Sequence, residues 1–183
     1  MTENKRNGRV TKLAAQGAKR RRNLEKIGGA VRSGSGRDFM DQTVAAASGV
    51  ADTFPKLLLK HALERPSRIA SREKEYGIWL SYDWARVRAE VEALACGLHT
   101  LGLKRGDRLI IVGDNRPHLY WSIAAAQALG AIPVPVYQDA VAAEMQYVVE
   151  HGEARLAIAE NQEQVDKLIE IKAQVPGLQT VVF

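Results

Sequence analysis

The chain has 183 residues, of which 46% are apolar, and a formal net charge of +5. A chain of this length and apolar content can bury the core of one ordinary domain, which excludes disorder throughout. Its one cysteine, Cys96, excludes an internal disulfide, and no spacing of Cys and His resembles a zinc site. The sequence shows neither an apolar run of 18 residues nor a secretory signal, so we expect a cytoplasmic protein.

The positive charge is concentrated at the N-terminus. Residues 1–40 contain 11 Lys and Arg against 3 Asp and Glu, whereas the remainder carries an excess of acidic residues. This segment includes the cluster Lys19-Arg20-Arg21-Arg22 and has no aromatic residue before Phe39, so it cannot bury much apolar surface. We expect residues 1–50 to be a disordered basic extension and linker, followed by a domain at 51–183.

Other roles for the basic extension stay open at this point. It could be an arm for nucleic acid or anionic lipid, because Lys and Arg that neutralise phosphates release counterions. It could also be an organelle-targeting sequence, since the segment is rich in Arg and poor in acidic residues. A third alternative is that Met40, which leads directly into the linker, is the true start of the protein.

The first part of the domain predicts a helix, a hairpin and a longer helix. Residues 54–65 form a helix in which Pro55 lies in the first turn, and two short strands follow around residues 74–77. The longer helix begins at Ser81 and repeats apolar residues at steps of three and four. Cys96 lies among small and apolar residues of this helix, which places it in the core.

Strands and helices alternate regularly from residue 108 onward. The predicted strands cover residues 108–112, 131–137, 155–159 and 180–183, and the predicted helices cover 117–129, 142–151 and 162–175. Strands without polar alternation, separated by helices, indicate a parallel sheet that is covered on both faces. The fold class is therefore α/β. The last strand would expose an edge, which favours poor solubility.

The turn after the first of these strands has the outline of a phosphate-binding loop. Such a loop needs several glycines, because converging N–H groups must reach the anion, and this turn offers Gly113 alone. Neither G-x-G-x-x-G nor G-x-x-x-x-G-K-[ST] occurs in the chain. We therefore predict that Asp114 or Asn115 caps the helix that contains Pro117, and that Arg116 lies at the surface.

Several longer stretches together resemble a known family. They are "REKEYGIW" with "SYDW", "GLKRGDRLIIVGDNRPHLYW", "AAQALGAIPVPVYQD" and "EMQYVVEHGEARLAIAENQEQVDKL". In this order and spacing, Thr53 to Phe183 resembles the N-terminal part of a long-chain fatty acid CoA ligase of the adenylate-forming (AMP-binding) superfamily. The resemblance implies the incomplete N-terminal part of an α/β enzyme fold. It also implies a two-step reaction in which Mg-ATP and a fatty acid give an acyl-adenylate, and CoA then gives acyl-CoA and AMP.

The resemblance also implies which parts of such an enzyme the sequence lacks. In relatives the phosphate loop, the adenine motif, the ribose-binding Asp and the catalytic Lys all follow the position of Phe183. We therefore expect a truncated chain with no catalytic residue, no bound metal and no activity of its own. One contact is similar to a site in short-chain relatives, whose basic residues lie near the CoA phosphate. That contact is Lys167, with Gln164 one turn earlier.

Two alternatives to the ligase fragment remain. The first is a non-catalytic α/β interaction module whose basic arm contacts nucleic acid or a membrane, which would make the cytoplasmic protein peripheral to that membrane. The second is a nucleotide-binding domain that uses the switch point of its parallel sheet without a recognised motif.

Overall fold

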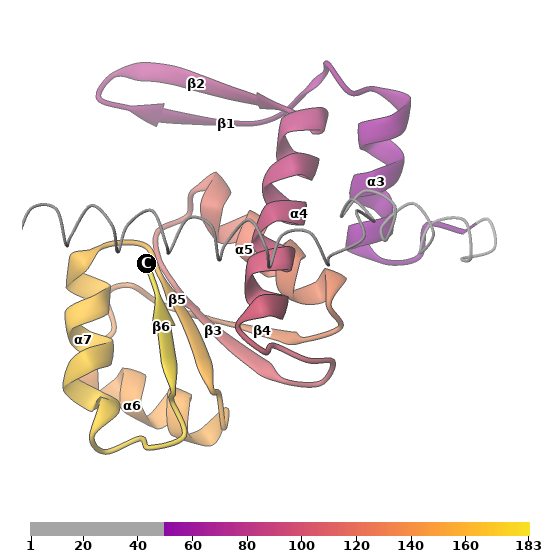
Figure 1. Ribbon diagram of the computed structural model, residues 1–183. Helices are drawn as coiled ribbons and strands as arrows, with labels where there is room; N and C mark the ends of the chain where they lie inside the picture. Colours follow the sequence, from indigo (N-terminus) through magenta and orange to yellow (C-terminus); the bar gives the residue numbers. More distant parts are fainter. Residues whose placement is uncertain (1–49) are drawn as a thin grey trace, which may run out of the picture. The chain divides into compact units, whose positions relative to one another are not determined.

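The computed structural model describes residues 50–183, so the basic extension and Met40 lie outside the described residues. Helices and strands follow one another much as the sequence patterns predict (Figure 1). The elements are α3 (Phe54–Glu64), β1 (Ile69–Glu75), β2 (Ile78–Asp83), α4 (Trp84–Thr100), β3 (Arg108–Val112), α5 (Pro117–Ala128), β4 (Ile132–Val136), α6 (Ala142–His151), β5 (Leu156–Ala159), α7 (Gln162–Lys172) and β6 (Thr180–Val182).

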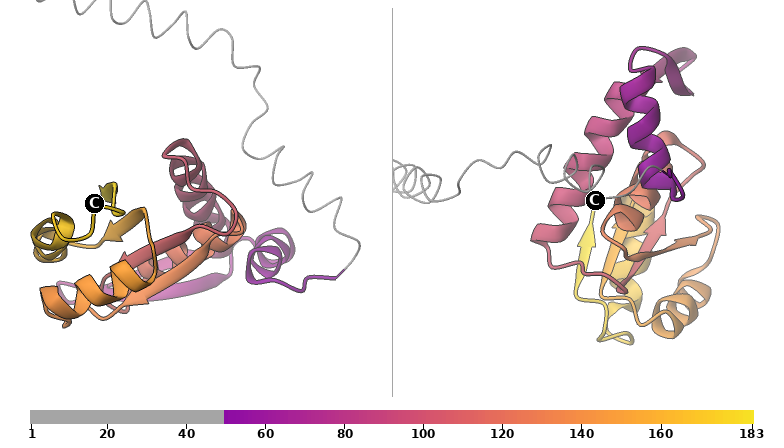
Figure 2. Two further views of the ribbon diagram at one scale, coloured as in Figure 1. Left: turned by 90° about the horizontal axis from the view of Figure 1, so that it is seen from below. Right: turned by 90° about the vertical axis from the view of Figure 1, so that its right-hand side faces the viewer.

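Four parallel strands form the main sheet in the order β4-β3-β5-β6. The helices α4 and α5 pack on one face of this sheet and α6 and α7 on the other (Figure 2). The strands β1 and β2 form a separate antiparallel hairpin. The prediction of an α/β fold with a parallel sheet covered on both faces is confirmed.

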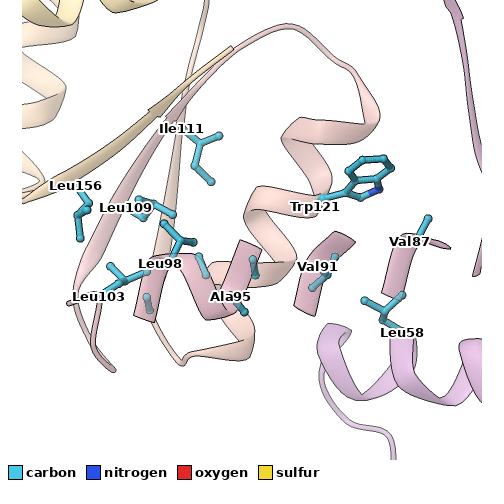
Figure 3. Packing of buried hydrophobic residues seen from close by; sticks show 13 residues of the cluster. Leu58, Val87, Val91, Ala95, Leu98, Leu103, Leu109, Ile111, Trp121 and Leu156 are labelled. Carbon is cyan, nitrogen blue, oxygen red and sulfur yellow. The ribbon is translucent and has the colours of Figure 1, made fainter. Parts of the chain in front are cut away.

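The strand β3 contributes to two hydrophobic cores because successive side chains point to opposite faces of the sheet. Leu109 and Ile111 pack against residues of α4 and α5 such as Leu98 and Trp121 (Figure 3). Ile110 and Val112 pack on the opposite face with buried residues of α6 and α7. Burial on both faces explains why this strand reads as a continuous apolar run rather than as an alternating pattern.

The edge strand β4 contains two prolines that cost the sheet no hydrogen bonds. The Ile132 N–H donates to the Asp107 carbonyl at 2.8 Å. Because successive backbone nitrogens point to opposite sides of a strand, the nitrogens of Pro133 and Pro135 point away from β3. A proline has no N–H to donate, and it is tolerated where that group would face outward from the sheet. The β4 edge therefore offers no N–H donor at these two positions to a further strand.

The long helix begins at Trp84, three residues later than the predicted start at Ser81. Ser81 belongs to β2, where it pairs with Arg72 of β1. The helix cap is Asp83, whose side chain accepts a hydrogen bond from the Arg86 N–H at 2.8 Å. Ser and Asp are both good caps, and strand pairing of Ser81 decides between them.

The prediction that Cys96 lies in the core is wrong. The buried residues of α4 are Val87, Val91, Ala95 and Leu98, whereas Cys96 is exposed. A helix turns by about 100° per residue, so the residue after Ala95 points away from the buried stripe. The apolar residues next to Cys96 in the sequence lie on the adjacent, buried face of the helix, so they do not show on which face Cys96 itself lies.

Substitutions at Leu98 and Cys96 test this assignment within one helix. We expect Leu98→Ala to lower the free energy of unfolding by about 2–4 kcal/mol, because it leaves a cavity beneath the sheet. Cys96→Ala should change it by less than about 0.5 kcal/mol, because an exposed side chain loses little packing. Urea denaturation followed by circular dichroism measures both, and similar losses at the two positions would contradict the assignment.

Candidate functional site

A cavity of about 580 Å³ lies at the carboxyl ends of β3 and β5. The chain leaves β3 toward β4 on one side and leaves β5 toward β6 on the other, so the boundary between β3 and β5 is the switch point of the sheet. Open α/β sheets bind ligands at this position. The hairpin contributes Glu73, Glu75 and Tyr82 to the lining of the cavity. We take this cavity as the candidate site, because it lies at the switch point of the sheet.

The turn after β3 is occupied by a carboxylate of the chain itself. Glu160, which directly follows β5, accepts a hydrogen bond from the Asp114 N–H. Its other oxygen lies 3.3 Å from Nε of Arg116. A Cβ atom at Gly113 would lie 2.7 Å from Oε2 and 2.9 Å from Cβ of Glu160, closer than real contacts allow. The close approach of Glu160 therefore requires a glycine at this position.

The prediction that Asp114 or Asn115 caps α5 is wrong. The residue before the helix is Arg116, and no side chain accepts a hydrogen bond from the first turn. Asp114 Oδ1 instead accepts from the Asn115 N–H at 2.7 Å, and Asn115 Oδ1 accepts from the Tyr120 hydroxyl at 2.5 Å. Pro117 at the helix start removes one of the N–H groups that a cap would satisfy. Arg116 is exposed, as predicted.

The hairpin side of the cavity holds two further carboxylates. The Tyr82 hydroxyl donates to Glu73 Oε1, and this hydrogen bond, with a smaller contribution from burial, raises the pKa of Tyr82 to about 12. Glu75 Oε1 lies 4.0 Å from Nη1 of Arg116. Arg116 therefore connects the hairpin to Glu160 at the switch point.

The charge of the cavity disfavours polyanions. Glu73, Glu75 and Glu160 face it against the single guanidinium of Arg116, and apolar side chains such as Ile111 and Ile158 form much of its wall. A triphosphate brought here would meet uncompensated carboxylates and no Gly-rich loop. Within residues 50–183, no group of three or more His, Cys, Asp or Glu is arranged to hold a metal ion. The residues present do not fit ATP or a Mg²⁺ ion at this cavity.

Lys167 lies apart from the residues that line this cavity. Its Nζ donates to the Gln138 carbonyl at 2.8 Å and lies 2.9 Å from Glu163 Oε1, so it joins α7 to the segment after β4. Gln164 is 2% exposed, and its Oε1 atom has no hydrogen-bond partner within the described structure. The structure thus turns Gln164 toward the core and Lys167 toward Gln138.

Sequence reasoning missed Glu160 and the pair of Tyr82 and Glu73. A glutamate directly after a buried strand was the available signal, because such a position lies at the carboxyl end of the sheet. Its partner Asp114 is 46 residues away, a pairing that required the strand order.

Comparison with known proteins identifies the family. Residues 58–183 match the sequence model of the family described as "AMP-binding enzyme". The chain belongs to the AMP-binding enzyme family. It is 28% identical over 135 residues to the long-chain-fatty-acid–CoA ligase FadD15 of Mycobacterium bovis, and the match covers 73% of this chain and 22% of that protein.

Other members of the family show the same partial coverage. Fatty acyl-CoA synthetase A of Dictyostelium discoideum is 35% identical over 91 residues, which cover 50% of this chain and 13% of that protein. The crystal structure of a putative long-chain-fatty-acid CoA ligase from Rhodopseudomonas palustris superposes with a TM-score of 0.62 at 25% identity. It covers 70% of this chain and 32% of that one. The chain therefore spans a minor part of the length of the relatives it matches.

The contact between Gly113 and Glu160 predicts coupled effects of substitution. Gly113→Ala should lower the free energy of unfolding by about 1–3 kcal/mol, because the new Cβ displaces the Glu160 side chain. In a Glu160→Gly background the same change should cost less than half as much. Denaturant unfolding of the unaltered chain, the two single variants and the double variant measures the coupling. Equal costs of Gly113→Ala in both backgrounds would show that Glu160 does not set the requirement for glycine.

The raised pKa of Tyr82 predicts an alkaline loss of stability. An unfolded tyrosine loses its proton near pH 10, whereas folded Tyr82 keeps it to about pH 12. The raised pKa of Tyr82 therefore makes its full contribution to the free energy of unfolding below pH 10. This contribution is lost as the pH rises from 10 to 12. Tyr82→Phe should show a smaller fall in unfolding free energy across this window than the unaltered chain. Identical pH profiles would remove Tyr82 as the cause.

Proposed function

We propose that the chain is the N-terminal part of a long-chain fatty acid CoA ligase. The observation that carries this proposal is the 28% identity to FadD15, which extends over 135 residues and thus over most of the described fold. The intact enzyme would convert ATP, a fatty acid and CoA into acyl-CoA, AMP and pyrophosphate through an acyl-adenylate. A carboxylate is a poor acyl donor, and adenylation gives it a good leaving group for attack by the CoA thiol.

The chain's own contribution in this proposal is structural. It supplies four strands of a parallel sheet with helices on both faces, and the carboxyl ends of these strands carry the turn at Gly113 and Glu160. Placing reactants and stabilising charge is the main work of such an enzyme. The cavity described above is acidic and lacks a Gly-rich loop, so we infer that Mg-ATP binds elsewhere in the enzyme and that these 183 residues do not catalyse adenylation alone.

A contact between Lys167 and a CoA phosphate stays part of the proposal. Its support is the position of Lys167 in the middle of the helix that follows β5, together with its positive charge. Binding a phosphate there would require Nζ to turn away from Glu163 and Gln138.

Transplanting the segment tests the proposed function. We expect the 183-residue chain to show no fatty-acid-dependent exchange between ATP and pyrophosphate. A chimera in which residues 53–183 replace the matching segment of FadD15 should show that exchange, because it restores a complete fold around the transplanted sheet. Parent FadD15 is the positive control. A folded chimera without exchange, or exchange by the chain alone, would contradict the proposal.

The same chimera separates the contact of Lys167 from the first half of the reaction. Lys167→Gln should raise the KM for CoA and leave exchange unchanged, because exchange does not involve CoA. Lys172→Gln, which removes an exposed lysine of the same helix, is the matched control. An unchanged KM for CoA would end the assignment of Lys167.

A further inference from the structure

The strand β6 leaves one side of its backbone unpaired at the edge of the main sheet (Figure 1). The Thr180 N–H donates to the Arg155 carbonyl at 3.2 Å, so it points toward β5. Because successive backbone groups point to opposite sides of a strand, the N–H and C=O of Val181 point away from β5. Among residues 50–183, no strand lies beside this edge. Val181 therefore offers a donor and an acceptor to a further strand.

The two edges of the main sheet differ in how they resist a further strand. Pro133 and Pro135 take the place of outward N–H groups on β4. The edge at β6 has no such protection, because Thr180, Val181 and Val182 include neither a proline nor a charged residue. Edge strands of native proteins are commonly protected by residues of these two kinds. Pairing is therefore blocked at β4 and open at β6.

The helix α7 adds an apolar stripe beside the open edge. The Lys167 Nζ donates to the Gln138 carbonyl, which follows β4, so this side of α7 faces toward β4. Val165 and Ile169 lie two residues before and after Lys167, and a helix turns by about 100° per residue, so both point the opposite way, past β6. Ile169 is 59% exposed, and Val165 is half-buried. Apolar surface thus continues from the strand edge onto the helix.

A two-fold axis through the middle of β6 would match this edge to the same edge of a second copy. The pairing about such an axis is antiparallel and places Val181 opposite the same residue of the other copy. Both copies point the N–H and C=O of this residue outward, so the two residues would exchange both backbone hydrogen bonds. Thr180 would lie opposite Val182 of the second copy, and β-branched side chains pack well on a pleated surface.

The same axis would bring the two α7 helices into contact. The helix packs over the sheet beside Ala157 and Val181, and strands lie about 4.8 Å apart, so the two helices would be about 10 Å apart, a normal packing distance. Ala157 pairs with Val181 and lies about 13 Å before the helix cap Asn161. The helix returns this distance in about nine residues. Ile169 therefore lies close to the level of the axis, where it would meet its copy.

We propose that β6 pairs with β6 of a second copy, so that two chains form a closed dimer with one continuous sheet. A symmetric pair uses the same surface of both copies, so one dimer occupies both open edges. Pro133 and Pro135 then protect the two outer edges, which stops growth into a filament. The proposal concerns the 183-residue chain and does not depend on the ligase function.

Sedimentation of the full chain over a wide range of concentrations tests the dimer, and amide hydrogen exchange tests its surface. We expect an equilibrium between monomer and dimer. At a concentration about ten times the dissociation constant, exchange of the Val181 amide should slow by about tenfold, because it requires a free edge. Thr180, which donates within each chain, should depend much less on concentration. A chain that stays monomeric, or a dimer without protection of Val181, would overturn the proposal.

A proline at the open edge tests the strand pairing itself. Val181→Pro removes the outward donor and no hydrogen bond to β5, just as Pro133 and Pro135 do in β4. We expect this variant to keep the circular dichroism of the monomer and to lose the dimer.

A charge on α7 tests the contact between the helices without altering the strand. Ile169→Lys should lower the association constant by at least about tenfold, because like charges would meet at the axis. Leu63→Lys is the matched control, since Leu63 is 61% exposed on α3, which belongs to the core on the other face of the sheet. It should leave the dimer unchanged. A dimer that persists in both Val181→Pro and Ile169→Lys, or assemblies that keep growing with concentration, would overturn the proposal.

Discussion

The structure depends on the burial of β3 on both of its faces. Leu109 and Ile111 pack into the core with α4 and α5, and Ile110 and Val112 pack into the core with α6 and α7. Because β3 also lies between β4 and β5, it is the strand at which the direction of the connections reverses. The same strand therefore joins the two cores and places its carboxyl end, with Gly113 and the turn that follows, at the switch point of the sheet.

At that switch point, the turn after β3 has the outline of an anion-binding turn, and a carboxylate of the chain itself lies against it. The N–H of Asp114 does receive an anion, namely the carboxylate of Glu160, and Gly113 leaves room for it. Arg116 offsets part of the charge and extends the network to Glu75 of the hairpin. This arrangement fixes the loops after β3 and β5 relative to each other. Within residues 50–183, no helix is both long and apolar enough to cross a membrane.

The parallel sheet could be predicted because burial on both faces produces continuous apolar strands separated by helices. The exact start of a helix and the side on which one residue lies were harder to predict. Ser81 and Asp83 are both suitable caps, and the pairing of Ser81 with Arg72 decided between them. Cys96 has apolar neighbours yet points away from the stripe that Ala95 joins. The contact of Glu160 with Asp114 depends on strand order, so no local pattern could reveal it.

We infer that the chain's own carboxylate, Glu160, closes the turn after β3 to phosphates. A thermal melt of the full chain with and without millimolar ATP tests this inference. A ligand that binds the folded domain raises its melting temperature, whereas ATP held by an unfolded segment does not. We expect the same melting temperature with and without ATP. A saturable increase that disappears in Arg116→Gln would contradict it, because it would place a phosphate beside Arg116 at the position assigned to Glu160.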